Sequence, residues 1–215
     1  MINKAYKIVL FGPPASGKGT QSEFLSDKLN LPEISMGDLL RDEISAGSQL
    51  GRQVEGLLAK GSLVSDEAVN LLLQKRLRQP EISQGFILDG YPRKVSQATF
   101  LDTLVDIDYA IEINISDVEA ISRIAGRRIC SQCDESFHLK YNPPRIENIC
   151  DKCGGQLIVR GDDSEKVIKD RLKLYHELTF PLVKFYLDQN KYLKINGEQS
   201  IPEVSQEILK KLKIK

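Results

Sequence analysis

The residues Gly12-Pro13-Pro14-Ala15-Ser16-Gly17-Lys18-Gly19-Thr20 decide how the rest of this chain is organised. They follow a short apolar run, Lys7-Ile8-Val9-Leu10-Phe11, and they lead into residues 21–29, whose large apolar side chains recur at helical spacing. Strand, glycine-rich loop and helix in this order predict a phosphate-binding loop. Backbone N–H groups and the helix N-terminus can surround phosphoryl oxygens, while Lys18 reaches the outer phosphates. Spacing, lysine and context together weigh against the alternative, a strand–turn–helix with incidental glycines.

The hydroxyl residue of this loop departs from the common pattern. The Ser or Thr expected directly after the lysine is Gly19, and the hydroxyl comes one position later as Thr20. We therefore expect any magnesium ion to be held mainly by phosphates, water and a distant aspartate. No G-x-G-x-x-G pattern can be laid over the loop, which argues against the dinucleotide-binding alternative.

Composition narrows the class of protein. The chain has 215 residues, of which 41% are hydrophobic and 28% charged, and its 30 basic and 30 acidic residues cancel. We therefore do not expect a generally basic surface that would bind polyanions such as nucleic acid. The N-terminus does not resemble a signal peptide, and no apolar run approaches the ~20 residues of a membrane span. A cytoplasmic protein without membrane partners is the expectation.

The order of apolar runs predicts an α/β fold. Five short runs alternate with helical patterns, which is typical of a five-stranded parallel sheet flanked by helices. We place these strands at residues 7–11, 31–34, 86–89, 109–115 and 192–195.

Two segments interrupt the alternation and are predicted to be inserted subdomains. The predicted division is a core of residues 1–34, 65–126 and 165–215, a small helical insertion at 35–64, and a second insertion at 127–164. One long helix, from about 165 to 189, is expected to kink at Pro181.

Gly85-Phe86-Ile87-Leu88-Asp89-Gly90-Tyr91-Pro92-Arg93 is the second informative stretch. Asp89 follows three large apolar residues, so it lies at the carboxyl end of a buried strand, where open α/β sheets bind ligands. An aspartate beside a phosphate loop suits magnesium bound through water. The alternative is a strand-end turn with an exposed charge pair.

Four cysteines form the third feature. Cys130 and Cys133 make one C-x-x-C pair and Cys150 and Cys153 another, with sixteen residues between the pairs. This spacing is typical of a four-thiolate zinc site, and four sulfurs leave no open position, so the zinc is expected to be structural. Two disulfides are the alternative, disfavoured in a reducing compartment. His138 lies between the pairs and is interpreted as a surface or nucleotide-facing residue, not as a ligand.

The remaining candidate site residues are arginines. Six arginines lie near the predicted carboxyl edge of the sheet or in the insertions: Arg41, Arg93, Arg123, Arg127, Arg160 and Arg171. Guanidinium groups grip phosphates through paired hydrogen bonds, so these residues suggest a site crowded with anionic oxygens. The chain has two histidines and no evident nucleophile–base pair. Phosphoryl transfer to a phosphate acceptor needs no base, because that oxygen is already ionised.

These motifs together resemble the adenylate kinases, and in particular the long-lid bacterial type with a four-cysteine, zinc-binding lid. The resemblance rests on the phosphate loop, residues 35–41, residues 89–93 with Gln97, residues 126–128, and residues 160–163 through Arg171. It covers nearly the whole chain in order. It implies a monomeric enzyme with a P-loop nucleoside monophosphate kinase fold that transfers a phosphoryl group reversibly from Mg-ATP to AMP, giving two ADP.

The resemblance also assigns residues to sites. The positions implied for ATP are Ala15, Ser16, Gly17, Lys18, Gly19, Thr20, Arg123, Arg127, Ser136, Phe137 and Gln199. The positions implied for AMP are Met36, Arg41, Ser62, Leu63, Val64, Gly90, Tyr91, Pro92, Arg93, Gln97, Arg160 and Arg171. The implied catalytic residues are Lys18, Arg93, Arg127, Arg160 and Arg171. Asp89 would hold Mg²⁺ through water, segment 35–64 would bind AMP, and segment 127–164 would be the lid.

Two residues depart from the family pattern. Ala15 replaces a glycine common in the loop, which is harmless if its φ stays negative. Met36 stands where a threonine is usual near the acceptor base, so a different acceptor, CMP or UMP, stays an alternative.

Another class of function, a nucleic-acid-binding zinc-ribbon NTPase, lacks support because no basic–aromatic stripe lies near the cysteine pairs.

Overall fold

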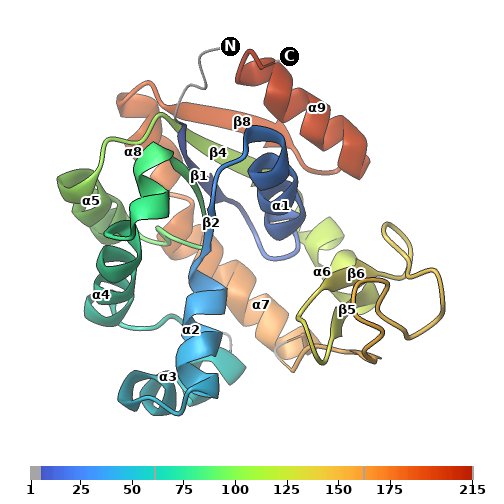
Figure 1. Ribbon diagram of the computed structural model, residues 1–215. Helices are drawn as coiled ribbons and strands as arrows, with labels where there is room; N and C mark the ends of the chain where they lie inside the picture. Colours follow the sequence, from blue (N-terminus) through green and yellow to red (C-terminus); the bar gives the residue numbers. More distant parts are fainter. Residues whose placement is uncertain (1–5, 61, 162, 215) are drawn as a thin grey trace.

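The computed structural model describes residues 6–60, 62–161 and 163–214, and it has an α/β core built on one parallel sheet. Five strands pair in the order β2-β3-β1-β4-β8, all parallel, which confirms the predicted fold class (Figure 1). The strands are β1 (Lys7–Phe11), β2 (Glu33–Ser35), β3 (Phe86–Asp89), β4 (Tyr109–Asn114) and β8 (Tyr192–Asn196).

Each face of the sheet is covered by helices because successive strand residues point to opposite sides. Ile8 and Leu10 of β1 face the layer formed by α1 (Lys18–Leu29) and α9 (Ile201–Lys211). Val9 and Phe11 face the other layer, whose helices include α4 (Asp66–Leu77), α5 (Val95–Leu104) and α8 (Leu182–Asp188). Alternation along a single strand therefore builds both halves of the core.

Serine residues begin many of the helices. The Ser35 hydroxyl accepts a hydrogen bond from Asp38 N at the start of α2 (Met36–Ser45), and Ser48 does the same for Gly51 N in α3 (Gln49–Ala59). Each such cap satisfies one of the N–H groups that a helix start leaves unpaired. The α2–α3 pair projects away from the sheet on the side where β2 and β3 end (Figure 1).

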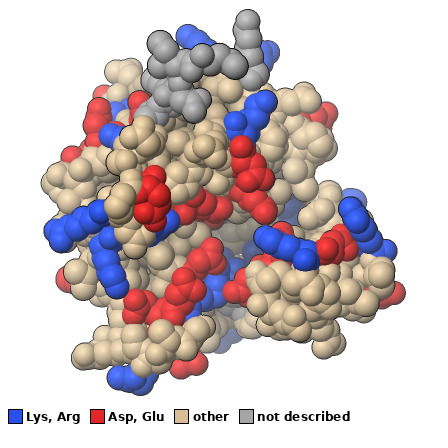
Figure 2. Space-filling view, in the orientation of Figure 1, with Lys and Arg blue, Asp and Glu red and all other residues tan. Residues whose placement is uncertain are grey.

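A second, smaller sheet belongs to a unit that approaches the α2–α3 pair, with Arg41 Nε in α2 lying 3.8 Å from Asp134 Oδ2. It follows α6 (Asp117–Gly126) and consists of three antiparallel strands in the order β6-β5-β7. These are β5 (Arg127–Cys130), β6 (Ser136–His138) and β7 (Leu157–Ile158). Figure 2 shows a hollow between this unit and the α2–α3 unit, in which Lys and Arg side chains are visible.

The long helix expected at 165–189 is interrupted earlier than predicted. α7 (Glu165–Leu174) passes into a π-helical turn, Tyr175–Thr179, and Pro181 directly precedes α8. The π-turn directs Tyr175 and Thr179 toward the interior, where both are buried. A π-turn inside a helix is often found at functional sites.

Candidate active site

The glycine-rich loop has the shape that its residues predict. Gly12 and Gly17 have φ values of 149° and 93°, and a Cβ atom at Gly12 would collide with the carbonyl oxygen of Ile113. Glycine is therefore required at this close approach. Ala15 has a φ of 59°, so the condition under which this alanine would be harmless, a negative φ, is not met. An alanine in this left-handed conformation costs roughly 1–2 kcal/mol, because its Cβ crowds the following carbonyl.

Lys18 lies at the first turn of α1 and folds back over the loop. Its Nζ donates hydrogen bonds to the carbonyl oxygens of Gly12, at 3.0 Å, and of Pro13, at 2.9 Å. Burial lowers the pKa of Lys18 to about 8, a shift that Asp89 opposes and that Arg93 and Arg171 reinforce. An anion bound beside Lys18 would therefore raise this pKa again and stabilise the charged ammonium.

Asp89 lies at the carboxyl end of β3, as predicted. One of its carboxylate oxygens, Oδ1, is buried without a hydrogen-bond partner. Burial raises the pKa of Asp89, although Lys18 and Arg93 act in the opposite direction. An orphaned carboxylate oxygen beside a phosphate loop fits a divalent cation held through water, so the residues present are compatible with Mg²⁺.

Two neighbouring cavities meet at this end of the sheet. The larger has a volume of about 330 Å³ and lies between the sheet edge and α2–α3, with Arg160 and Gly161 on its far side. Eleven of the residues predicted for AMP line it: Met36, Arg41, Ser62, Leu63, Val64, Gly90, Tyr91, Arg93, Gln97, Arg160 and Arg171. Its lining combines apolar residues such as Met36, Leu40 and Val64 with four arginines, as expected of a nucleotide pocket.

The smaller cavity, of about 90 Å³, lies over the phosphate loop. Lys18 and Pro92 line it, together with Tyr175 and Thr179, which the sequence analysis did not single out. Thr179 donates a hydrogen bond from its hydroxyl to the Arg93 carbonyl, at 2.9 Å. The π-turn could have drawn attention to these residues only after the fold was known.

Arg93 and Arg171 line both cavities. Arg93 comes from the loop after β3, and its Nε donates to the Gly90 carbonyl at 2.9 Å. Arg171 comes from α7. Two guanidinium groups from distant segments therefore lie at the boundary between the phosphate loop and the larger cavity.

Asp163 holds two of the arginines and was missed as a site residue by the sequence analysis. Its side chain is fully buried and accepts two hydrogen bonds from Arg127, one of them from Nε at 2.7 Å. Its Oδ1 also lies 4.0 Å from Nη1 of Arg171. The carboxylate balances two neighbouring positive charges that would otherwise repel each other.

The positions predicted for the ATP side are only partly assembled. Arg123 donates to the Gly197 carbonyl at 2.8 Å, which brings it to the turn that carries Gln199. Ser136 and Phe137 lie on β6, where Ser136 is exposed and the Phe137 side chain is buried against Cys130 and Cys150. Any contact of Phe137 with a nucleotide would therefore come from its backbone.

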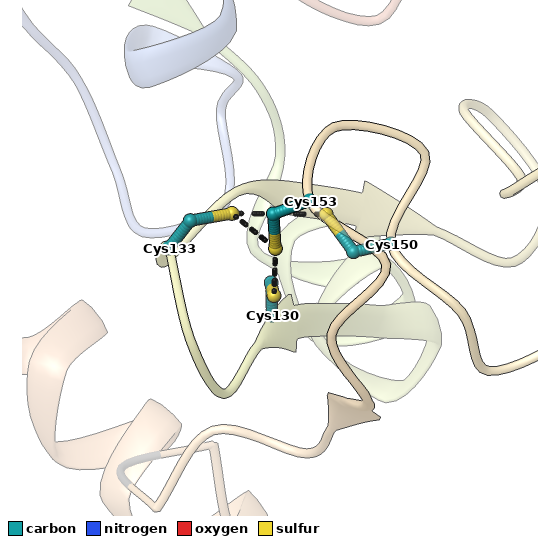
Figure 3. A group of neighbouring side chains, drawn as sticks. All are labelled: Cys130, Cys133, Cys150 and Cys153. Atoms are coloured by element: carbon teal, nitrogen blue, oxygen red, sulfur yellow. Dashed lines mark hydrogen bonds between the residues drawn. The ribbon is translucent and has the colours of Figure 1, made fainter.

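The four cysteines converge, as Figure 3 shows. Their sulfurs all lie within 4.8 Å of one another, and neighbouring sulfurs are 3.3 to 3.7 Å apart. A disulfide needs sulfurs about 2.05 Å apart, whereas a zinc ion with tetrahedral bonds of about 2.3 Å spaces its thiolates by about 3.8 Å. The cluster fits a closed, structural zinc site.

His138 lies outside the four-cysteine cluster, as predicted, and connects β6 to α6 through its ring nitrogens. Its ring is half-buried, and its Nδ1 accepts hydrogen bonds from Lys140 N and Tyr141 N. The other nitrogen, Nε2, therefore carries the proton and donates to the Arg123 carbonyl at 2.9 Å. Burial lowers the pKa of His138, which favours this neutral form.

The fold and the site define a class of protein. A parallel sheet with a phosphate loop at the carboxyl end of β1, a buried aspartate beside it and converging arginines is the arrangement of a P-loop phosphotransferase.

Comparison with known proteins names the family. The sequence model of adenylate kinase matches residues 10–191. The adenylate kinase of Methanocella arvoryzae is 44% identical over 207 residues, which is 94% of this chain and 96% of the relative. The adenylate kinase of Acetivibrio thermocellus is 43% identical over 211 residues, covering 96% and 97% of the two chains. The chain therefore belongs to the adenylate kinase family, whose reaction is reversible phosphoryl transfer from ATP to AMP, giving two ADP.

One finding bears on membrane association. None of the helices in residues 6–60, 62–161 and 163–214 combines the length and apolar character that crossing a bilayer would require.

Proposed function

We propose that the two cavities are the two halves of one adenylate kinase site, with AMP in the larger and the ATP phosphates over the loop. The observation that supports this most directly is that Arg93 and Arg171 line both cavities. A group transferred from one cavity to the other passes these two guanidinium groups. They would bind the phosphates of donor and acceptor at once and align them for in-line transfer.

The proposed mechanism works by positioning and by charge neutralisation. Lys18 and the loop amides hold the donor phosphates, while Arg41 and Arg93 hold the acceptor phosphate. Arg127, Arg160 and Arg171 stabilise the charge that spreads over the transferred group. No general base is required, because the acceptor phosphate oxygen is already ionised. Mg²⁺ bound with ATP, and held through water by Asp89, would supply further neutralising charge.

The two units outside the sheet have separate proposed tasks. Residues 35–64 bind AMP, and residues 127–164 form a lid that closes over ATP and excludes water from the transfer. The core then comprises residues 1–34, 65–126 and 165–215. Zinc held by the four cysteines would cross-link the lid, whose own cluster of buried residues is small.

We also propose that the chain acts in the cytoplasm as a monomer, without nucleic acid. The clustered free thiols suit a reducing compartment. Both cavities and all the arginines discussed belong to one chain, so the reaction calls for no partner copy.

An arginine substitution tests the shared boundary. Arg171→Ala should lower kcat for ADP formation about a hundredfold, because one charged contact to the transition state contributes roughly 3 kcal/mol. Lys173→Ala is the matched control, since Lys173 lies on the same helix and its side chain is 74% exposed. A variant Arg171→Ala with native turnover and an unchanged melting curve would overturn the assignment. So would a native protein that forms no ADP from ATP and AMP.

A further inference from the structure

The side-chain amide of Gln97 is held on both sides inside the larger cavity. Gln97 is buried, and its Oε1 accepts a hydrogen bond from Arg93 N at 2.7 Å. Its Nε2 donates to Oδ1 of Asp66 at 2.8 Å. A backbone N–H can only donate and a carboxylate can only accept, so the two partners together allow a single orientation of the amide.

Asp66 is itself fixed in place. It is the first residue of α4, and its Oδ1 accepts from Lys94 Nζ at 2.9 Å while its Oδ2 accepts from Ser96 Oγ at 2.7 Å. Burial acts to raise the pKa of Asp66, but the hydrogen bonds from Lys94, Ser96 and Gln97 lower it overall. Asp66 therefore stays ionised, and an acceptor only, across the neutral range.

The fixed amide has an N–H and an oxygen lone pair left over. Nε2 carries two protons and Oε1 two lone pairs, and Asp66 and Arg93 each occupy one of them. Gln97 lines a cavity that is apolar near Met36, so the remaining donor and acceptor are the groups that it can offer to a base bound there. A base edge with an amino group beside an unprotonated ring nitrogen complements this pair. A base edge with an oxo group beside a protonated ring nitrogen does not fit in the same pose. Its oxygen would face Oε1 of Gln97, and its ring N–H would face the N–H of Nε2.

We infer that Asp66 is a positioning residue for acceptor specificity: it locks the Gln97 amide in the orientation that accepts a 6-amino purine and rejects a 6-oxo purine. Asp66 does not line the cavity, so it acts through Gln97. This inference rests on the proposed function, in which the larger cavity holds the acceptor nucleotide. The same lock rejects uracil, which has an oxo group beside a protonated nitrogen, and it does not reject cytosine.

Two neutral variants isolate the effect of the hydrogen-bond acceptor. Asp66→Ala removes the acceptor and lets the amide turn over. Asp66→Asn keeps an oxygen for Lys94 and Gln97, and its amide can donate to the Ser96 hydroxyl. Both variants lose the same negative charge at the start of α4, so any effect of that charge on the helix is matched. Asp66→Ser replaces Asp66→Ala if the latter melts early, because a hydroxyl can donate as well as accept and so does not fix the direction of the amide.

The measurement is kcat/KM for AMP and for inosine monophosphate, which differs from AMP only at the 6-position and in the proton on N1. We expect the AMP preference to fall about tenfold in Asp66→Ala, because one of the two groups that penalise the flipped amide is gone. Asp66→Asn should keep the native preference. An unchanged preference in Asp66→Ala, with native AMP turnover and melting, would overturn the inference. An equal loss of the AMP preference in Asp66→Ala and Asp66→Asn would also overturn the inference. Failure of the native protein to use AMP would instead refute the proposed function.

Discussion

If Lys18 binds the ATP phosphates as proposed, its lowered pKa should make the use of ATP sensitive to alkaline pH. In the free protein burial brings this pKa to about 8, compared with an ordinary value near 10.5. Below pH 8 the ammonium is charged and can bind phosphates, and above pH 8 it loses its proton and its charge. At pH 9 only about a tenth of the free enzyme keeps the charged lysine. We therefore expect kcat/KM for ATP to fall about tenfold between pH 7 and pH 9.

The saturated enzyme should behave differently. Bound phosphates stabilise the ammonium and raise its pKa again, so kcat should decline at a higher pH than kcat/KM does. The assay is initial-rate ADP formation from pH 6.5 to 9.5 at constant free Mg²⁺.

Lys18→Arg is the control for this pH dependence. A guanidinium keeps its charge over the whole range, so this variant should be less active but should lack the decline. If kcat/KM of the native enzyme stayed flat to pH 9.5, or if Lys18→Arg declined in parallel with it, the reasoning from Lys18 would be refuted.

Three further predictions follow from individual residues. Ala15→Gly should relieve the left-handed alanine and raise the free energy of unfolding by about 1 kcal/mol, so that Tm rises by about 2–4 °C in a scanning calorimeter; a lower Tm would contradict the strain. Removing zinc with a chelator should lower Tm and speed hydrogen exchange of the amides in 127–164, and metal analysis of the untreated protein should find about one zinc per chain. A protein without metal, or one whose exchange is unchanged by chelation, would rule out the structural zinc. Met36→Thr should widen the preference for AMP over CMP, because a hydroxyl adds a hydrogen-bond partner at the acceptor base that a thioether cannot replace. An unchanged or narrower preference would contradict this argument.

Some features of this protein are local and could be predicted from sequence. The apolar run 7–11, the glycines and Lys18 specify a strand, a loop and a helix within one short stretch, since each depends on neighbouring residues only. The cysteines also predicted the four-sulfur cluster, because the tight turn inside each C-x-x-C pair is local and the spacing between the pairs is typical of a zinc site. The three apolar residues before Asp89 likewise predicted that it lies at the end of a strand.

Other features depend on packing between distant segments. Arg93 and Arg171 line both cavities because α7 packs across the end of the sheet, and no spacing in the sequence encodes that contact. The pairing of Asp163 with Arg127 joins residues 36 positions apart. Ala15 adopts a positive φ against its own preference, which surrounding contacts must impose.

The orientation of the Gln97 side chain shows most clearly the difference between what the sequence predicts and what the tertiary structure decides. Sequence and family resemblance predict that the Gln97 amide belongs to the proposed acceptor site, but an amide can turn either way. Its direction is set by Asp66, 31 positions earlier in the chain, and by the backbone N–H of Arg93. Local sequence thus determined the elements and the chemical groups of this protein. Tertiary structure decided which groups meet, because burial of the two faces of the sheet brings distant segments together and leaves each polar group only the partners within its reach.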